Sequence, residues 1–221
     1  MAKATKDSLG NVWVYFGTGE NNDPTWKPPT TPTAIPDTND TKNRLYGIKE
    51  DPDFTATYTT ANLTNITASP TYNATTATTN GWYINLSTNT LTRSDGTTIA
   101  SPSGEKMISD PTVFGGVVYF STYVPDQGAG SACGLSGDAF LYGIKYISAG
   151  GAFDSDSRTK YIGHGIGSSP IISMRPGSSS ADIYATASGG AGTAALTQKV
   201  GETPTTSSMT NILYWRDRRV Q

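Results

Sequence analysis

Near its start the chain alternates bulky β-forming residues and then stops at two glycines, in "VWVYFGTGE" at residues 12–20. Successive side chains of a strand point to opposite faces of a sheet, so the alternation defines two sets of positions. One face carries Val12, Val14 and Phe16, and the other carries Trp13 and Tyr15. Because both faces are apolar, we expect a strand that is covered on both sides.

A close copy of this strand, "VVYFSTYVP", returns at residues 117–125. Each copy leads through a long polar loop into a second similar strand, "RLYGIKED" at 44–51 and "AFLYGIKY" at 139–146. The first strands align with an offset of 104 and the second strands with an offset of 96, so the two units differ by eight loop residues. A fainter third echo is "ADIYATASGG" at 181–190. Repeats of this kind indicate duplicated supersecondary units with variable surface loops.

Further short strands are expected at "GWYINLS" (81–87) and "GIGSSPIISM" (165–174), each beside a glycine-marked turn. The pattern predicts one all-β domain over residues 1–221, a β-propeller or partial propeller of short antiparallel meander blades. A blade takes roughly 40 to 50 residues, so we expect an incomplete ring and a chain that is the C-terminal part of something longer. Pro-rich (24–36) and Thr-rich (55–80) stretches are expected to be surface loops, and "NILYWRDRRVQ" (211–221) an edge or closing strand.

The amino-acid composition is consistent with many short strands, and the net charge excludes some classes of binding partner. The chain has 24 Gly and 13 Pro, and only 15% of its residues are charged. A net charge of −2 gives no reason to expect nucleic acid or an anionic membrane surface as a partner. The sequence contains neither an apolar run of membrane-spanning length nor an export signal. Cys133 is the single cysteine, so no disulfide can form within the chain.

The candidate metal ligands lie in "DTNDTKN", where oxygen-bearing side chains occupy alternate positions as in a calcium loop. These residues are Asp37, Asn39, Thr41 and Asn43. Against calcium, Lys42 stands where the turn prefers Gly, and Ile48 stands where a bidentate Glu is expected. The alternative is a solvated loop of Asx-turns.

Catalytic chemistry has little support in the sequence. His164 is the only histidine, and no G-x-S-x-G motif accompanies it, so we expect a turn histidine and no catalytic triad. Cys133 is expected to be buried or externally paired, because only His164 could serve as its base. Trp26 and Trp82 lie near polar loops and are candidates for a sugar-stacking surface, with a role in the core as the alternative.

Several motifs in a fixed order resemble the C-terminal β-propeller of the PilC/PilY family of type IV pilus tip-associated proteins. They are "DSLGNVWVYFGTGE", "DTKNRLYGIKED", "GWYINL", "GEKMISDPTVFGGVVYFSTYVPDQ", "GDAFLYGIKY", "GIGSSPIIS" and "ILYWRDRRV". The resemblance implies an exported, non-enzymatic protein at the cell surface or pilus tip that promotes pilus assembly, opposes retraction and mediates adhesion. The family's D-x-D-x-D-G calcium loop has no match here, so calcium regulation is not carried onto any residue.

The implied partners are pilin or minor pilin subunits, a further chain that supplies missing blades, and a host or abiotic surface. Two other functions stay open at this point. A quinoprotein-like propeller dehydrogenase has similar repeats, although no carboxylate and cation constellation is evident. A carbohydrate-binding surface module would use the loop aromatics.

Overall fold

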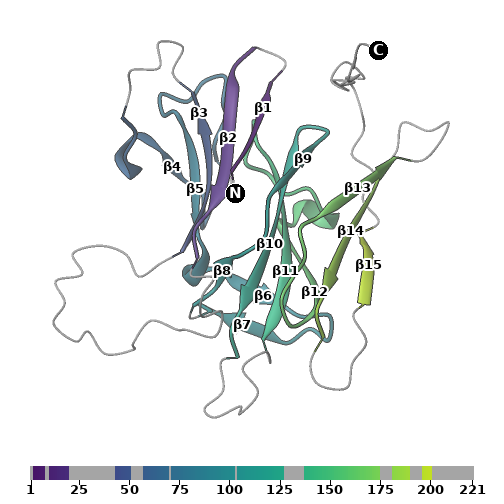
Figure 1. Cartoon of the computed structure of the whole chain (residues 1–221). Coiled ribbons are helices and arrows are strands. Elements are labelled where there is room, and N and C mark those ends of the chain that lie inside the picture. The colour runs from purple at the N-terminus through teal and green to yellow at the C-terminus, as the bar shows by residue number, and fades with distance from the viewer. Residues whose placement is uncertain are drawn as a thin grey trace, which may run out of the picture.

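The computed structural model describes residues 2–7, 10–19, 43–50, 57–69, 71–102, 104–126, 137–174, 181–189 and 196–200. It is an all-β structure, as expected, in which antiparallel strands form three main sheets and one small hairpin (Figure 1). The strands are β1 (Lys3–Lys6), β2 (Val12–Gly17), β3 (Arg44–Lys49), β4 (Thr64–Asn65), β5 (Gly81–Asn85), β6 (Thr90–Thr92), β7 (Thr98–Ala100), β8 (Lys106–Met107), β9 (Thr112–Phe114), β10 (Val117–Val124), β11 (Asp138–Lys145), β12 (Thr159–His164), β13 (Ile171–Met174), β14 (Ala181–Ala187) and β15 (Leu196–Val200). Three short 3-10 helices are η1 (Thr60–Asn62), η2 (Leu86–Thr88) and η3 (Asp154–Asp156).

Each main sheet follows the chain order almost strand by strand. The N-terminal sheet has the order β1-β2-β3-β5-β4, and only its short β4 pairs in parallel. The central sheet has the order β12-β11-β10-β8, with β9 also paired to β10. The third sheet has the order β13-β14-β15, and β6 and β7 form a separate hairpin. Such meanders of neighbouring strands are what propeller blades are made of.

The duplication seen in the sequence is confirmed by the strand register. Val14 lies opposite Ile48 in the N-terminal sheet, and Val118 lies opposite Ile144 in the central sheet. The pair Phe16 and Tyr46 likewise corresponds to Phe120 and Tyr142. Because both offsets of the sequence alignment are reproduced, β2 and β3 are the structural counterparts of β10 and β11.

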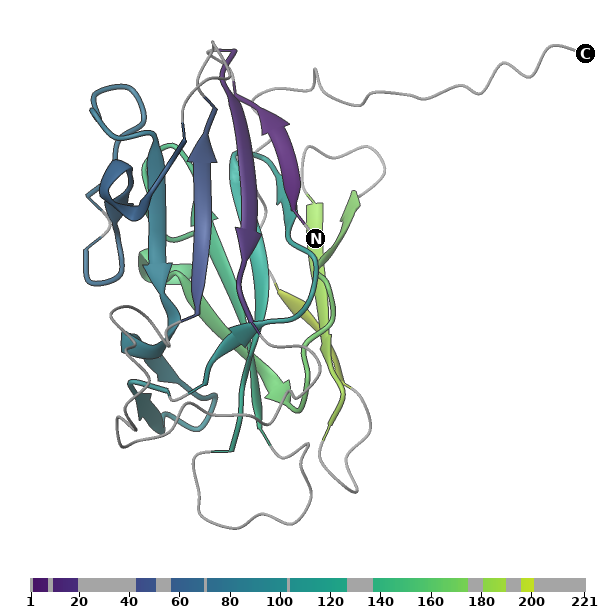
Figure 2. The same ribbon diagram turned by 60° about the vertical axis from the view of Figure 1, so that its left-hand side comes forward.

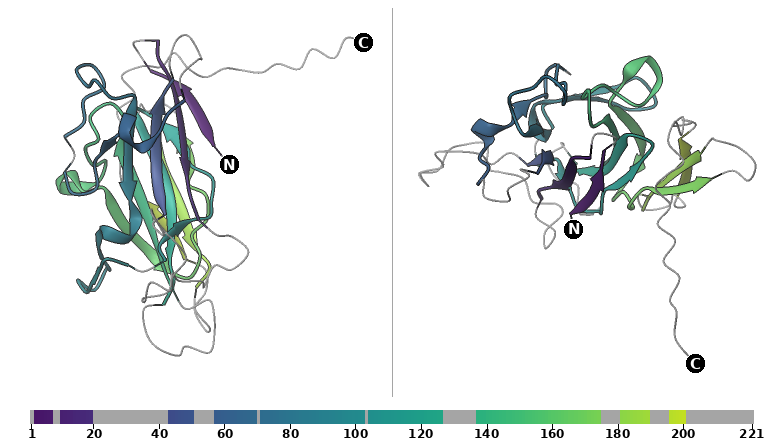
Figure 3. Two further views of the ribbon diagram at one scale, coloured as in Figure 1. Left: turned by 90° about the vertical axis from the view of Figure 1, so that its left-hand side faces the viewer. Right: turned by 90° about the horizontal axis from the view of Figure 1, so that it is seen from above.

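The sheets stack face to face around two hydrophobic cores (Figures 2 and 3). The first core lies between the N-terminal and central sheets and includes Trp13, Tyr15, Trp82, Phe120 and Tyr142. The second core lies between the central and third sheets and includes Tyr119, Leu141, Phe153, Ile183 and Ala185. Even-numbered positions of β10 face the first core and odd-numbered positions face the second. The central sheet is therefore sandwiched as an inner blade of a propeller would be.

Coverage of β2 differs from what its apolar alternation predicts. All eight residues of β10 are buried, so the expectation of two covered faces is confirmed for that strand. In β2, Trp13 and Tyr15 are fully buried, but Val12, Val14 and Phe16 are only half-buried. The reason is that no sheet of the described chain packs on this second face.

The glycine shared by the two "LYGIK" strands makes room for an aromatic ring. A Cβ atom on Gly47 would lie 2.6 Å from the ring of Trp82, and one on Gly143 would lie 2.9 Å from the ring of Phe153. Real Cβ atoms do not come so close to other heavy atoms, so a side chain at either position would displace the ring. The glycine of the motif thus leaves space for a neighbouring aromatic ring to pack closely against the strand.

The Thr-rich stretch is more than the surface loop expected from its composition. Its residues 57–69 and 71–80 include η1 and β4, and they place Ile66 and Tyr72 in the first core. Arg158 of the central sheet donates hydrogen bonds to the carbonyl oxygens of Ile66 and Thr67, the latter at 2.6 Å. The scattered apolar residues of this stretch therefore cap the end of the first core. Residues 24–36 and the expected closing strand at 211–221 lie outside the described residues.

Candidate functional site

The half-buried face of the N-terminal sheet carries a row of aromatic side chains. Phe16, Tyr46 and Tyr83 lie directly opposite one another on β2, β3 and β5. The ring centroids of Phe16 and Tyr46 are 4.9 Å apart and stacked, and those of Tyr46 and Tyr83 are 6.2 Å apart. We call the exposed side of this sheet, formed by Val12, Val14, Phe16, Arg44, Tyr46, Ile48, Tyr83 and Asn85, the outer face. It offers a flat aromatic and aliphatic surface of the kind that is enriched in protein interfaces.

Arg44 covers one end of this aromatic row. Its guanidinium carbon lies 4.8 Å from the ring centroid of Tyr83, a cation–π arrangement. The same side chain donates hydrogen bonds to Asn85 Oδ1 at 2.8 Å and to the Tyr46 hydroxyl at 3.3 Å. The outer face therefore has an apolar centre and a fixed cationic margin.

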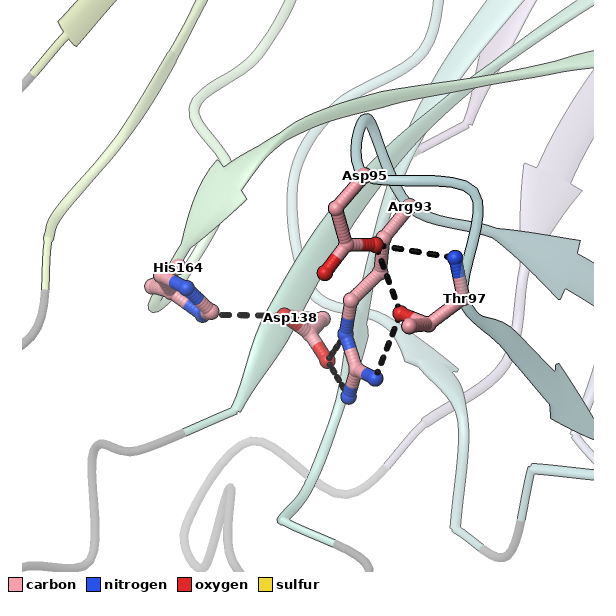
Figure 4. Close-up of polar contacts among 5 residues, drawn as sticks. All are labelled: Arg93, Asp95, Thr97, Asp138 and His164. Carbon is pink, nitrogen blue, oxygen red and sulfur yellow. Dashed lines mark hydrogen bonds and ion pairs between the residues drawn. The ribbon is translucent and has the colours of Figure 1, made fainter.

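A polar cluster joins three strands at one end of the central sheet (Figure 4). Asp138, at the start of β11, is buried, with 4% of the residue exposed. Its Oδ2 accepts two hydrogen bonds from Arg93, from Nε at 2.9 Å and from Nη2 at 2.6 Å. Its Oδ1 lies 3.0 Å from Nδ1 of His164, the last residue of β12. Asp138 thus ties the β6–β7 hairpin to the central sheet and lies against the end of β12, a strand of the same sheet.

The tip of the β6–β7 hairpin holds Arg93 in place. Asp95 Oδ1 accepts hydrogen bonds from the backbone N and the hydroxyl of Thr97, at 2.9 and 2.7 Å, and this forms an Asx-turn. The same two bonds lower the pKa of Asp95. Gly96 has a φ of +84°, which favours glycine at this point of the turn. "SDGT" is therefore a local turn signal that fixes where the Arg93 side chain leaves the strand.

Opposite charges pair within the polar cluster. The hydrogen bond to Asp138 raises the pKa of Arg93, which keeps the guanidinium charged. Burial, with a smaller contribution from Asp138, raises the pKa of Tyr161 to about 12, so its hydroxyl stays protonated. His164 is 62% exposed in its side chain and can meet a partner in solvent. Within the described ranges, neither a serine hydroxyl nor a thiol is hydrogen-bonded to this histidine.

A second polar network lies inside the molecule. Glu105 is fully buried, and its Oε1 accepts hydrogen bonds from the Thr122 hydroxyl at 2.8 Å and the Tyr142 hydroxyl at 2.9 Å. Asn89 Nδ2 in turn donates to the Tyr142 hydroxyl at 3.1 Å. Desolvation raises the pKa of Glu105 to about 8, although both hydroxyl donors oppose the shift. The carboxyl is therefore neutral near pH 7, and it joins β10 to β11 as a structural group.

A small cavity of about 120 Å³ opens beside this network. It is lined by Ile84, Asn89, Thr90, Tyr142, Arg158 and Thr159. The guanidinium of Arg158 is engaged by the carbonyl oxygens of the Thr-rich stretch, and burial lowers its pKa. The cavity wall is thus part of the joint between the N-terminal and central sheets.

Trp82 is a core residue, which was the alternative to the candidate sugar-stacking surface in the sequence analysis. It is fully buried in the first core, and its indole nitrogen donates to the carbonyl oxygen of Tyr146 at 3.1 Å. Its ring lies against Gly47 on the inner side of the sheet, where no ligand can stack on it. Trp26, the other residue of that candidate surface, lies outside the described residues.

Of the four candidate calcium ligands, only Asn43 is described; Asp37, Asn39 and Thr41 are not. The side chain of Asn43 is used internally, because its Nδ2 donates to the carbonyl oxygen of Glu105 at 2.8 Å. Its Oδ1 accepts from the Thr18 hydroxyl at 3.5 Å. Among the described residues, no group of three or more His, Cys, Asp or Glu side chains gathers as metal ligands would. The calcium loop stays a prediction.

The outer face and the polar cluster were not expected as sites from the sequence. His164 was expected to be a turn histidine, and it ends a strand, where it faces Asp138. Arg93, Asp138 and His164 are far apart in the sequence, so only the fold brings them together. Cys133 lies outside the described residues. In the part of the chain that the structure covers, no helix has the length and apolarity required to cross a bilayer.

Comparison with solved structures finds a likeness of fold. No protein-family model and no curated protein matches the chain. Among solved structures, the C-terminal domain of Pseudomonas aeruginosa PilY1 matches 89% of this chain with 16% sequence identity and a TM-score of 0.48. The chain spans 44% of that solved chain. At this identity and TM-score the likeness supports no conclusion about a shared partner or activity.

Proposed function

We propose that the chain is a non-enzymatic, exported protein of a type IV pilus system that acts through binding surfaces. Its role would be to support pilus assembly, to oppose retraction and to contribute to surface adhesion. The support comes from the collinear motifs that resemble the PilC/PilY family, from "VWVYFGTGE" near the start to "ILYWRDRRV" near the end. Pilin or minor pilin subunits are the proposed partners.

The observation that carries a binding role is the character of the polar cluster. Arg93 and Asp138 form an ion pair, and the exposed side chain of His164 beside them is available to a partner. Rigid donors and acceptors at the end of a stacked sheet suit recognition of another protein. The stacked sheets would then supply a stiff support that transmits force from the cluster to the rest of the molecule.

The test measures binding of the purified chain to immobilised major and minor pilins of the same organism. We expect saturable binding that His164→Ala weakens about five- to tenfold, the loss expected for one polar contact. Lys145→Ala is the matched control, because Lys145 is exposed at the opposite end of β11 and pairs only with the exposed Asp156 among the described residues. Absence of saturable binding to every pilin would contradict the proposal.

The two other functions from the sequence have their own tests. Dye reduction after reconstitution with pyrroloquinoline quinone would indicate a quinoprotein-like dehydrogenase and would overturn a non-enzymatic role. A glycan array would reveal a carbohydrate-binding module, with Trp26→Ala as the informative variant. Trp82→Ala is unsuitable for that purpose, because Trp82 is a core residue.

A further inference from the structure

The three main sheets repeat one arrangement of two unlike faces. Aligning "WVYFG", "VVYFS" and "DIYAT" places Val14, Val118 and Ile183 at equivalent positions, each followed by a tyrosine. These positions lie on β2, β10 and β14, which occupy the same place in their sheets. We call the side with Val14, Val118 or Ile183 the valine face, and the side with Tyr15, Tyr119 or Tyr184 the tyrosine face.

The two cores are built by the same rule. In the first core, Tyr15 on the tyrosine face of the N-terminal sheet meets Val118 and Phe120 on the valine face of the central sheet. In the second core, Tyr119 on the tyrosine face of the central sheet meets Ile183 and Ala185 on the valine face of the third sheet. Each sheet therefore offers its tyrosine face to the valine face of the next sheet.

This rule leaves one face of each kind without a partner sheet among the described residues. On the N-terminal sheet it is the valine face, the outer face described above, where Val12, Val14 and Phe16 are half-buried. On the third sheet it is the tyrosine face, where Tyr184 is half-buried and Ile171 lies directly opposite it. Ile171 is 64% exposed, and among the described residues only Met174, at 42%, is also an exposed large hydrophobic residue. The two faces lie on opposite flanks of the stack (Figure 1).

We propose that two copies of this chain associate head to tail, with the tyrosine face of one copy's third sheet on the valine face of the other copy's N-terminal sheet. The contact would repeat the packing that each copy already uses twice internally. It is heterologous, because the two surfaces in contact are different, and such contacts form rings or open chains of subunits. A second copy of the chain is the proposed occupant because each copy carries both complementary surfaces, one uncovered valine face and one uncovered tyrosine face. This inference is independent of the proposed pilus role.

The experiment measures the mass of the full chain in solution by light scattering or sedimentation over a range of concentrations. We expect the mass to rise above that of the 23.3 kDa monomer as concentration increases. Ile171→Glu on the tyrosine face and Phe16→Glu on the valine face should each weaken self-association about tenfold or more, because each buries an unpaired carboxylate in the contact. Thr98→Glu on the exposed β7 hairpin is the control and should leave association unchanged.

Mixing the two variants gives the decisive result. Phe16→Glu keeps an intact tyrosine face and Ile171→Glu keeps an intact valine face, so an equimolar mixture should recover a one-to-one dimer. If Phe16→Glu does not fold, Val12→Glu at the margin of the same face replaces it. A monomer at every concentration would overturn the proposal. So would self-association that both variants leave intact, or a mixture that stays monomeric while the unmodified chain associates.

Discussion

The N-terminal and central sheets are built from the same motif and differ in what surrounds them. Phe16 and Tyr46 occupy the same cross-strand pair as Phe120 and Tyr142. The first pair is half-buried on the outer face, whereas the second is at most 1% exposed between two sheets. The apolar alternation of a strand therefore indicates which of its faces can be buried. Whether a face is in fact buried depends on the sheets that pack beside it.

The two sheets also differ in the hydrogen-bond donors that surround a buried carboxyl group. In the N-terminal sheet, Asp7 accepts hydrogen bonds from the backbone and side-chain nitrogens of Asn11 and from the indole of Trp13, at 2.9 to 3.0 Å. Beside the central sheet, Glu105 is met by two hydroxyls, and its Oε2 has no hydrogen-bond partner among the described residues. Nitrogen donors around Asp7 suit a carboxylate, while the surroundings of Glu105 suit a neutral carboxyl.

The largest predicted effect is a difference in unfolding free energy between alanine variants of the equivalent residues Phe120 and Phe16. Phe120→Ala should lower the free energy of unfolding by about 3–5 kcal/mol, because it leaves a cavity in a core closed on both sides. Phe16→Ala should cost about 1–2 kcal/mol, since that side chain is already partly in contact with water. Urea unfolding of the two variants at a concentration where the chain is monomeric checks the difference. Equal losses would mean that the two sheets are covered alike.

A smaller effect concerns the pH dependence that Glu105 confers. The pKa of its carboxyl rises from 4.5 to about 8 on folding, so the folded state holds a proton that the unfolded state releases between these values. The free energy of unfolding should therefore fall as pH increases from about 4.5 to about 8, by a few kcal/mol at most, and then level off.

Glu105→Gln is the matching variant, because it keeps the shape of the neutral carboxyl and cannot ionise. We expect its unfolding free energy to lose this slope and to exceed that of the unmodified chain at pH 8. Asp154→Asn, on an exposed residue of η3, is the control and should keep the slope. An unchanged slope in Glu105→Gln would show that the carboxyl is ionised in the folded state near pH 7.

Much of the fold follows from local sequence patterns. The alternation in "VWVYF" and "VVYF" and the shared "LYGIK" predicted strands, and the two offsets predicted that the two units are duplicates with loops of different length. The Thr-rich stretch was harder, because its few apolar residues, such as Ile66 and Tyr72, have no periodicity that marks them as core. The short strand β1, "KATK", carries no apolar signal and is held by its pairing with β2.

The sites could be predicted less well, because they depend on tertiary contacts. The sequence left Trp82 as either a surface or a core aromatic, and the space that Gly47 leaves beside it accommodates its ring in the core. The "SDGT" turn residues indicate a hairpin next to Arg93. No local sequence pattern predicts that Arg93 contacts Asp138, or that Asp138 lies beside His164. Phe16 and Tyr46 are only half-buried because no other sheet of the described chain covers their face, and a strand's own sequence does not encode its neighbours.

Hydroxyl-radical footprinting of the dilute, monomeric chain tests the contrast between the two sheets most directly. Oxidation of each aromatic side chain is read by mass spectrometry and compared between equivalent positions. We predict that Phe16 and Tyr46 are oxidised many times faster than Phe120 and Tyr142. Equal protection of both pairs, or equal labelling of both, would contradict an account in which one sheet is covered on both faces and its duplicate on only one.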